Sequence, residues 1–364
     1  MKITDIDKNF EIVSTPSGET FEEYTIPDPR FSLSGVFFEE STDRFVRMPS
    51  EIADLVNPGV KGLNGHTAGG RLRFTTDAQK ISLTVTYDNL TVFPHMPLSG
   101  SGGFALLEET ERGYFHRAAF IPPVWSGGDN SSAHGFSVVK DIPGEGMRKY
   151  VLFFPSYNDV RSLKIGFPAG TKVGASAPLR PEVKPILYYG SSITQGGCST
   201  RPDNAYQSYI YKRNGIDFVN LGFSGSARAE KTIVDYLASL DPSVFVVDYD
   251  HNSPGADYLR QTHYPLYKAF RDAHPDTPMI LISAPDNDGE TPTWLERAAV
   301  VRETYDRAVA EGDKNVYFID GKELFDGADR GSCTVDRTHP NDLGFWLFAK
   351  KVYAKLIEID PVFR

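Results

Sequence analysis

The sequence predicts two units of different class: an all-β sandwich of the jelly-roll type, followed by an α/β unit with a parallel sheet covered by helices on both faces. Residues before about 174 alternate apolar and polar side chains as half-buried strands do. Residues after about 184 alternate short apolar runs with amphipathic stretches. The 364 residues also exceed what one hydrophobic core usually serves. We therefore expect domains at residues 1–178 and 184–364.

Short strands are expected throughout the first unit. Apolar or β-branched side chains occupy every second position of residues 71–76 and 80–87, which suits a sheet with one wet face. Clusters of Gly, Pro, Asn and Asp separate further strands, and no long helical period intervenes. These further strands are expected at residues 44–48, 103–107, 114–120, 149–154 and 162–167. Many short strands between turn signals predict a β-sandwich.

The second unit begins after a linker. Residues 174–182 are small, contain two prolines and lack periodicity. Beyond them we expect strands at residues 186–189, 218–221, 244–248, 279–283 and 316–319, and helices at residues 205–213, 229–240, 257–273, 293–311 and 341–357. Near-continuous apolar strands that alternate with helices predict a parallel sheet, with functional residues beyond the carboxyl ends of its strands.

Composition narrows the class of partner. The formal net charge of −10 and pI near 5.3 argue against nucleic-acid and anionic-membrane partners, because no basic stretch offsets repulsion from phosphates. Two cysteines give no disulfide framework. No apolar region of signal-peptide length follows Lys2, and no run approaches the roughly 20 apolar residues that cross a bilayer. We expect a cytoplasmic protein, and the sequence makes no prediction of its oligomeric state.

A nucleophile is predicted at Ser192, which follows the apolar run of residues 186–189 and Gly190. A buried strand fixes the backbone there, and the turn after it presents the hydroxyl. Serine needs a base, and Asp336 precedes His339 by three residues near the other end of the chain. Because Pro340 suits the first position of a helix, Asp336 and His339 should lie on the turn that enters it.

Two further segments carry candidate donors for an oxyanion. Gly225 closes the stretch Asn220-Leu221-Gly222-Phe223-Ser224, and Asn252 follows the strand expected at residues 244–248. The backbone amides of Ser192 and Gly225 and the side-chain amide of Asn252 would stabilise the negative charge of a tetrahedral intermediate.

These segments, in this order, resemble the SGNH hydrolases, the superfamily of GDSL-type esterases and lipases. Gly190-Ser191-Ser192 corresponds to the family's first block, Gly225 to its second, Asp250-His251-Asn252 to its third, and Asp336 with His339 to its fifth. The resemblance implies a flavodoxin-like domain and a serine acylhydrolase that needs no cofactor. It makes Ser192 the nucleophile, His339 the base and Asp336 the residue that orients the base.

Two positions depart from the family pattern. Ser191 replaces the usual aspartate, which leaves the nucleophile intact. Asp250 replaces a glycine, so that a carboxylate stands beside the oxyanion donor Asn252.

The resemblance also suggests a substrate class. A β-sandwich before such a domain is similar to the arrangement in family-2 carbohydrate esterases and in polyketide-tailoring acyl esterases. Aromatic residues in or near the motifs favour sugar rings: Tyr188, Tyr189, Tyr206, Tyr249 and Trp294. We expect short acyl esters of a small molecule or oligosaccharide, above all O-acetyl groups. Candidate substrate-binding residues are His251, Asp250 and His95, the last in an irregular loop of the first unit.

Two alternatives remain open from the residues alone. Asp248, Asp250 and His251 are ligand types that metals accept, so a metal-dependent hydrolase is a second hypothesis. Strand alternation would send Asp248 and Asp250 to one side and His251 to the other. A catalytically inert sugar-binding protein, with its oxyanion hole spoiled by Asp250, is the third.

Overall fold

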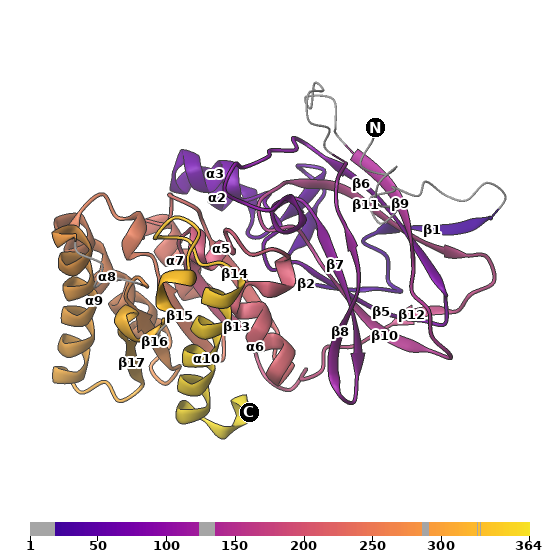
Figure 1. Ribbon diagram of the computed structural model, residues 1–364. Coiled ribbons are helices and arrows are strands. Elements are labelled where there is room, and N and C mark those ends of the chain that lie inside the picture. Colours follow the sequence, from indigo (N-terminus) through magenta and orange to yellow (C-terminus); the bar gives the residue numbers. More distant parts are fainter. Residues whose placement is uncertain (1–18, 124–134, 286–290, 326, 328) are drawn as a thin grey trace.

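The structure is a computed structural model that describes residues 19–123, 135–285, 291–325, 327 and 329–364. Figure 1 shows a β-rich unit beside a helix-covered parallel sheet, so the predicted fold class is confirmed. The start of the chain, on which the expectation about a signal sequence depends, lies outside the described residues. None of the helices described is long and apolar enough to cross a membrane.

Two antiparallel sheets form the N-terminal unit. Within the described residues, one has the strand order β1-β11-β6-β9 and the other β12-β5-β10-β7-β8, with β2 on β5. A separate hairpin pairs β3 with β4. The elements are β1 (Phe21–Ile26), β2 (Ser32–Ser34), β3 (Phe37–Glu39), β4 (Arg44–Val46), β5 (Arg71–Thr76), β6 (Lys80–Tyr87), α4 (Leu98–Ser101), β7 (Phe104–Thr110), β8 (Gly113–Phe120), β9 (Gly135–Asp141), β10 (Arg148–Phe153), β11 (Val160–Pro168) and β12 (Val173–Ala175).

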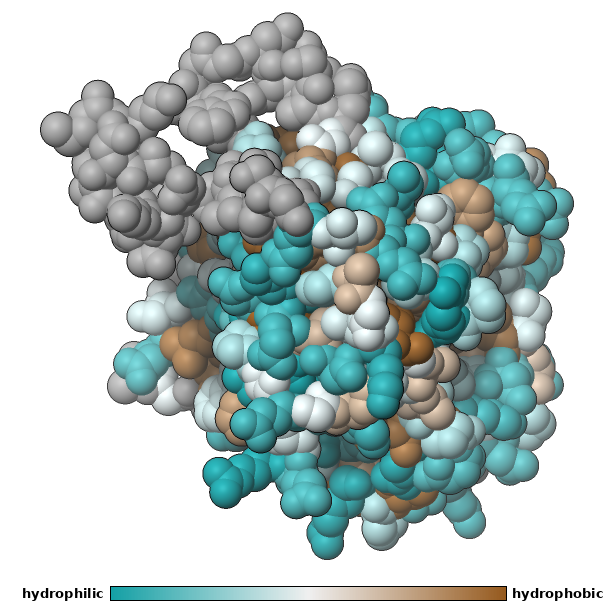
Figure 2. All heavy atoms as spheres, turned by 90° about the vertical axis from the view of Figure 1, so that its right-hand side faces the viewer, coloured by the Kyte–Doolittle hydropathy of each residue, from teal (hydrophilic) through white to brown (hydrophobic). Residues whose placement is uncertain are grey.

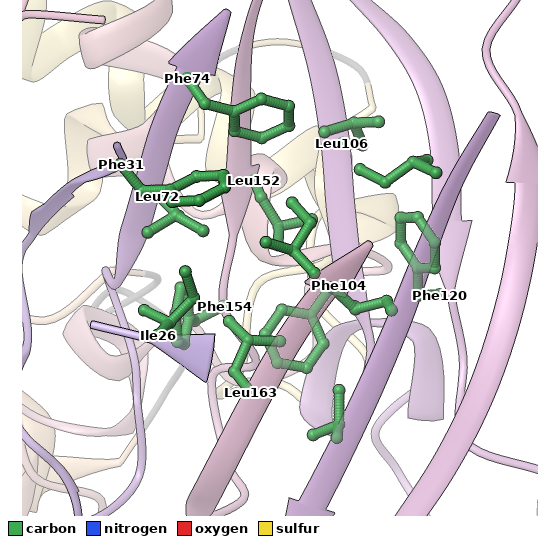
Figure 3. Close-up of a cluster of buried hydrophobic side chains, with 14 of the residues drawn as sticks. Ile26, Phe31, Leu72, Phe74, Phe104, Leu106, Phe120, Leu152, Phe154 and Leu163 are labelled. Atoms are coloured by element: carbon green, nitrogen blue, oxygen red, sulfur yellow. The ribbon is translucent and has the colours of Figure 1, made fainter. Parts of the chain in front are cut away.

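The sandwich core lies between these two sheets. Figure 3 shows Phe104 and Leu152 of one sheet close to Ile26 and Leu163 of the other. All four side chains are at most 2% exposed, and burying one such side chain stabilises the fold by about 1.5–3 kcal/mol. The outward end of the sandwich carries mainly hydrophilic side chains (Figure 2).

Two short helices that the sequence did not predict, α2 (Ser50–Val56) and α3 (Pro58–Leu63), follow β4. Asn57 caps α3 by accepting a hydrogen bond from the backbone N–H of Val60 at 2.9 Å, and Pro58 occupies the first helical position. Ala53 and Val60 pack into the core of the C-terminal unit. Chain from the first unit therefore covers part of the second.

The parallel sheet has the order β14-β13-β15-β16-β17 among the described residues. Its predicted strands agree with the structure to within one residue at each end, and the long helices to within two. The elements are β13 (Ile186–Gly190), α5 (Ser192–Gln195), η3 (Pro202–Asn204), α6 (Tyr206–Asn214), β14 (Phe218–Gly222), α7 (Lys231–Ser239), β15 (Val244–Asp248), η4 (Asp250–Asn252), α8 (Ala256–Ala273), β16 (Met279–Ile282), α9 (Pro292–Ala310), β17 (Val316–Ile319), η5 (Gly321–Glu323), η6 (Arg330–Ser332), α10 (Asp342–Ile359) and η7 (Pro361–Phe363).

Helices cover both faces of this sheet. One face packs on α6 and α10, and the other packs on α7, α8 and α9 (Figure 1). The first of these cores also includes Leu107 and Phe153, which project from the outer face of the second antiparallel sheet. The sandwich thus shares an apolar interface with the α/β unit.

The predicted linker begins inside a strand. Gly174 and Ala175 belong to β12, which pairs with β5 at the edge of the sandwich. That part of the linker prediction was wrong, because backbone pairing with β5 orders residues that lack an apolar period. The domain boundary itself, between residues 178 and 184, stays a prediction.

Candidate active site

Ser192 opens α5 directly after β13. The Ser191 side chain caps this short helix by accepting a hydrogen bond from the Ile193 N–H at 3.1 Å. A Cβ at Gly190 would collide with Asp248 and Thr194 side-chain oxygens, so glycine is required where the strand turns. Ser191, which departs from the family pattern, thus has a local role as the cap of the nucleophile turn.

His339 lies between Ser192 and Asp336. Its Nε2 is 2.9 Å from Ser192 Oγ, although the two residues are 147 positions apart, and its Nδ1 is 2.7 Å from Asp336 Oδ2. With the ring proton on Nδ1, His339 donates to the carboxylate and accepts from the serine hydroxyl. The arrangement can move the serine proton to the imidazole as the oxygen attacks an electrophilic carbon.

The Asp336 carboxylate is anchored by its own turn. Its Oδ1 accepts hydrogen bonds from the backbone N–H groups of His339 at 2.8 Å and of Thr338 at 3.1 Å. Partial burial opposes the charge, yet these bonds and the His339 ring lower the pKa of Asp336 below its usual value. Asp336 is therefore an anion at neutral pH, able to stabilise a protonated imidazole.

The expected place of Pro340 at the start of the last helix was wrong. Helix α10 begins at Asp342, and Asn341 caps it by accepting from the Gly344 N–H at 3.2 Å. Pro340 instead forms a β-bridge with Thr334. The asparagine side chain can accept a hydrogen bond from the unpaired backbone N–H groups in the first turn of the helix, whereas a proline side chain has no acceptor. Asp336 and His339 lie in the turn between the bridged residues.

The loops that carry Gly225 and Asn252 flank the segment that carries Ser192. They follow β14 and β15, the two neighbours of β13 in the sheet, so all three carboxyl ends meet at one edge (Figure 1). Gly225 has a φ of 67°, in the left-handed region that favours glycine. Asn252 Oδ1 accepts a hydrogen bond from the Ala227 N–H at 3.3 Å, which leaves its Nδ2 as the donor end. The oxyanion role of Ser192, Gly225 and Asn252 stays a prediction.

Asp248 and Asp250 each accept hydrogen bonds from backbone N–H groups. Asp248 accepts from the Ser191 N–H at 3.3 Å and from the Thr194 hydroxyl, and burial raises its pKa to about 7. Asp250 accepts from the Ala284 N–H and the His251 N–H, both at 2.9 Å, and burial raises its pKa to about 6. The Asp250 carboxylate is thus hydrogen-bonded to the loop after β16.

His251 follows Asp250 within the same turn, η4. Its ring centroid is 5.5 Å from that of Trp294, and burial, with Arg297 and His339 nearby, lowers its pKa to about 4. The expected strand alternation past Asp248 was wrong, because residues 250–252 form a 3₁₀ turn. A neutral imidazole beside an indole can hydrogen-bond a hydroxyl-rich ligand, and the substrate-binding roles of His251 and Asp250 stay predictions.

A loop of the sandwich reaches this site. The His95 ring centroid is 5.5 Å from that of His339, and the Cys198 thiol donates to the His95 carbonyl oxygen at 3.4 Å. Burial and Asp336 raise the pKa of Cys198 to about 12, so its thiol stays protonated. The predicted approach of His95 to the second unit agrees with this placement, and its contact with substrate stays a prediction.

Within the described part of the chain, one group of His, Cys, Asp or Glu side chains has ligand atoms close enough to share a metal ion. It consists of His95, Cys198 and His339, whose ligand atoms all lie within 4.8 Å of one another. Asp248, Asp250 and His251, the cluster on which the metal-hydrolase hypothesis depends, do not form such a group.

Sequence patterns missed several buried residues that support Ser192 and the neighbouring loops. Tyr157 donates its hydroxyl to the Ser192 carbonyl oxygen at 3.1 Å. Gln195 accepts from the Ser224 N–H at 2.9 Å and donates to the Ser156 carbonyl oxygen at 3.0 Å. Arg47 donates to the carbonyl oxygen of Gly222 at the end of β14. Only Gln195 stands near a motif, three residues after Ser192.

The aromatic residues near the motifs are mostly core. Tyr188, Tyr189, Tyr206 and Tyr249 are at most 1% exposed, whereas Trp294 is half-buried. Trp294 is thus the member of this set that remains accessible to a ligand.

Two family models match the chain. Residues 183–358 match the GDSL-like lipase/acylhydrolase family, and residues 24–173 match the N-terminus of SGNH hydrolase-type esterases. No curated protein sequence matches the chain.

Several solved structures share both units. One described as a GDSL-like lipase from Bacteroides ovatus is 25% identical, with a TM-score of 0.82, over 93% of this chain and 98% of that one. A salicylyl-acyltransferase from a tetracycline biosynthetic pathway is 18% identical, with a TM-score of 0.74, over 94% and 99%.

A family two carbohydrate esterase from Clostridium thermocellum, solved with cellohexaose, is 16% identical, with a TM-score of 0.57, over 81% of this chain and 94% of that one. At such identity these last two structures show the fold alone. The two family models divide the chain between them, and the strands and helices follow the same division. The chain therefore belongs to the GDSL-type SGNH hydrolases and is an ester hydrolase, with an SGNH-type N-terminal domain before its GDSL-like lipase/acylhydrolase domain.

Proposed function

We propose that this chain is a serine acylhydrolase that removes short acyl groups, above all O-acetyl groups, from a carbohydrate. The observation that carries the proposal is the hydrogen-bonded row from Ser192 through His339 to Asp336, with heavy-atom separations of 2.9 and 2.7 Å. Such a row is the arrangement that activates a serine for attack on an ester carbonyl.

The reaction follows from that row. Ser192 Oγ attacks the carbonyl carbon while His339 Nε2 takes the hydroxyl proton, and Asp336 stabilises the resulting imidazolium. Donors from Ser192, Gly225 and Asn252 would hold the negative oxygen, each typically contributing about 3 kcal/mol to the transition state. Collapse of the intermediate passes the proton to the leaving alcohol, and water then attacks the acyl-serine by the same route.

A carbohydrate substrate is supported by two observations. The chain shares its two-unit fold with a family two carbohydrate esterase solved with cellohexaose. The half-buried Trp294 lies beside His251, and an indole next to a neutral imidazole suits a sugar ring. The inert-binding hypothesis is disfavoured because the Asp250 carboxylate bonds the loop after β16.

The test measures hydrolysis of p-nitrophenyl esters of increasing chain length beside acetylated xylo- and cello-oligosaccharides. We expect p-nitrophenyl acetate to exceed the longer esters in kcat/KM, and acetate release from at least one acetylated sugar. Preference for long acyl chains would contradict the substrate class and leave the serine mechanism standing.

The serine pair supplies a matched control for the mechanism. Ser192→Ala should abolish turnover, whereas Ser191→Ala removes a helix cap that contributes about 1 kcal/mol and should retain measurable turnover. Both variants should keep the far-ultraviolet circular dichroism of the wild type. Turnover in Ser192→Ala at the wild-type rate would refute the serine mechanism.

A further inference from the structure

Three side chains lie close together beside Ser192. As a group they have no role in the proposed ester hydrolysis. His95 comes from the loop between β6 and α4, Cys198 from the segment after α5, and His339 from the turn before α10. Their ligand atoms, two imidazole nitrogens and one thiol sulfur, all lie within 4.8 Å of one another. Cys198 is 2% exposed, and the two histidines are half-buried.

The donor set has a chemical preference. A thiolate and two imidazoles suit zinc and other borderline-soft divalent cations, while magnesium and calcium prefer oxygen ligands. Zinc bonds of about 2.0–2.1 Å to nitrogen and 2.3 Å to sulfur place tetrahedral ligand atoms about 3.3–3.6 Å apart. Binding would therefore draw the ligand atoms, which now lie within 4.8 Å of one another, to that spacing by rotation of the His95 and Cys198 side chains.

The geometry around His339 also resembles a metal ligand's surroundings. Its Nδ1 faces the Asp336 carboxylate at 2.7 Å, which leaves Nε2 as the atom available to a cation. A carboxylate behind a ligating histidine fixes the ring and strengthens it as a donor. Nε2 is also the atom that lies 2.9 Å from Ser192 Oγ.

We propose that His95, Cys198 and His339 form an inhibitory site for a thiolate-binding divalent cation such as Zn²⁺, which switches off the hydrolase. The switch rests on the proposed role of His339 as base. The cation takes the Nε2 lone pair, so Ser192 loses the acceptor for its proton. The Cys198 thiol releases its proton to solvent when the sulfur binds, and water or Ser192 Oγ completes the four ligands. No electron is transferred, and chelation reverses the change.

A cation at this site would have the opposite effect on activity to the cation of the metal-hydrolase hypothesis. A metal-dependent hydrolase loses activity when the cation is removed, whereas this site gains activity. The sandwich supplies His95, so the N-terminal unit would take part in control of the site as well as in its support.

The first test is inhibition. Hydrolysis of p-nitrophenyl acetate by the full chain is measured during titration with ZnCl₂ and, separately, MgCl₂. We expect Zn²⁺ to remove turnover, EDTA to restore it, and Mg²⁺ to have no effect. Loss of even an outer partner of a ligand costs about 10–100-fold in metal affinity, so Cys198→Ala should raise the inhibitory Zn²⁺ concentration more than about tenfold. Equal inhibition of wild type and Cys198→Ala would overturn the proposal.

The second test detects the site without turnover. Co²⁺ bound to a thiolate gives a near-ultraviolet charge-transfer absorption, and we expect it in the wild type and in Ser192→Ala. It should disappear in Cys198→Ala and persist in Cys333→Ala, because the other buried cysteine lies outside the group. Absence of the band in wild type would overturn the site even if the esterase is active. A band in an inactive protein would refute the esterase mechanism alone.

Discussion

The parallel sheet and the antiparallel sandwich contribute to the candidate site by different means. The sheet presents Ser192, Gly225 and Asn252 on loops that follow three adjacent strands, a consequence of parallel topology. The sandwich contributes isolated side chains instead, such as His95 beside His339 and Tyr157 behind Ser192. In the proposed mechanism the reacting groups thus come from the α/β unit, and the sandwich supplies side chains that pack around them.

Two buried arginines of the sandwich unit contact opposite ends of β14. At its start, Arg71 donates to the Asp217 carboxylate at 2.6 Å and to the Phe218 carbonyl oxygen at 2.7 Å. At its end, Arg47 donates to the Gly222 carbonyl oxygen and to Leu63 O at 2.7 Å. Burial lowers the pKa of Arg47 to about 9, so the protein retains a costly buried cation next to the loop that carries Gly225. We infer that Arg47 positions that loop.

The largest expected effect tests whether the chemistry depends on the second unit alone. His339→Ala should reduce kcat by about 10⁶-fold because it removes the proposed base, and Asp336→Ala by about 10⁴-fold because the proposed role of the carboxylate is only to orient and stabilise the ring. Steady-state kinetics on p-nitrophenyl acetate measures both. Thr338→Ala is the matched control, since it keeps the backbone N–H that Asp336 accepts. Substantial turnover in His339→Ala would contradict the proposal that catalysis depends on His339 of the α/β unit.

The sequence predicted the second unit closely for a physical reason. Buried parallel strands are continuous apolar runs, and strand ends collect the motif residues, so periodicity and motif point to the same positions. Ser192, Asp336 and His339 were therefore identified from local signals, and the structure brings them into hydrogen-bond range. The prediction that Pro340 begins the last helix was wrong, because the start of the helix depends on which side chain caps its first N–H groups.

The first unit was predicted less completely. Strands β5 and β6 alternate strongly enough to be located from sequence, but β9 was missed because pairing across the sheet with β6, as Val138 opposite Leu83, stabilises it. Helix α3 was missed because Pro58 and two glycines predict a turn. No sequence motif marks Arg47 or Tyr157, because their hydrogen-bond partners lie more than a hundred positions away or in the other unit.

An intermediate effect tests the supporting role of the sandwich. Arg47→Met should lower kcat/KM by about 10–100-fold, because loss of about 1.5–3 kcal/mol of charge-assisted hydrogen bonding frees the loop that begins at Gly222. Kinetics and urea unfolding are measured together. Arg71→Met, at the other end of the same strand, is the control: it should lower stability while kcat/KM of the folded protein stays near that of wild type. Equal loss of kcat/KM in both would show a general effect of the interface.

The smallest expected effect concerns the Asp248 carboxylate, which accepts hydrogen bonds from the turn that carries Ser192. Burial raises the pKa of Asp248 from 3.8 to about 7 in the folded state, while the unfolded side chain keeps a value near 3.9. The folded state therefore binds the proton more tightly. The stability that this proton confers is complete below about pH 4 and is lost as the pH rises through about 7.

Asp248→Asn should remove this dependence and keep the bonds from Ser191 and Thr194, because the amide oxygen still accepts them. Between pH 6 and pH 8, a group with a folded pKa of about 7 loses about 1.4 kcal/mol of stability. Urea unfolding of both proteins at the two pH values measures the difference. Parallel pH profiles for wild type and variant would mean that the Asp248 carboxyl does not titrate between pH 6 and pH 8 in the folded protein, which would contradict the prediction.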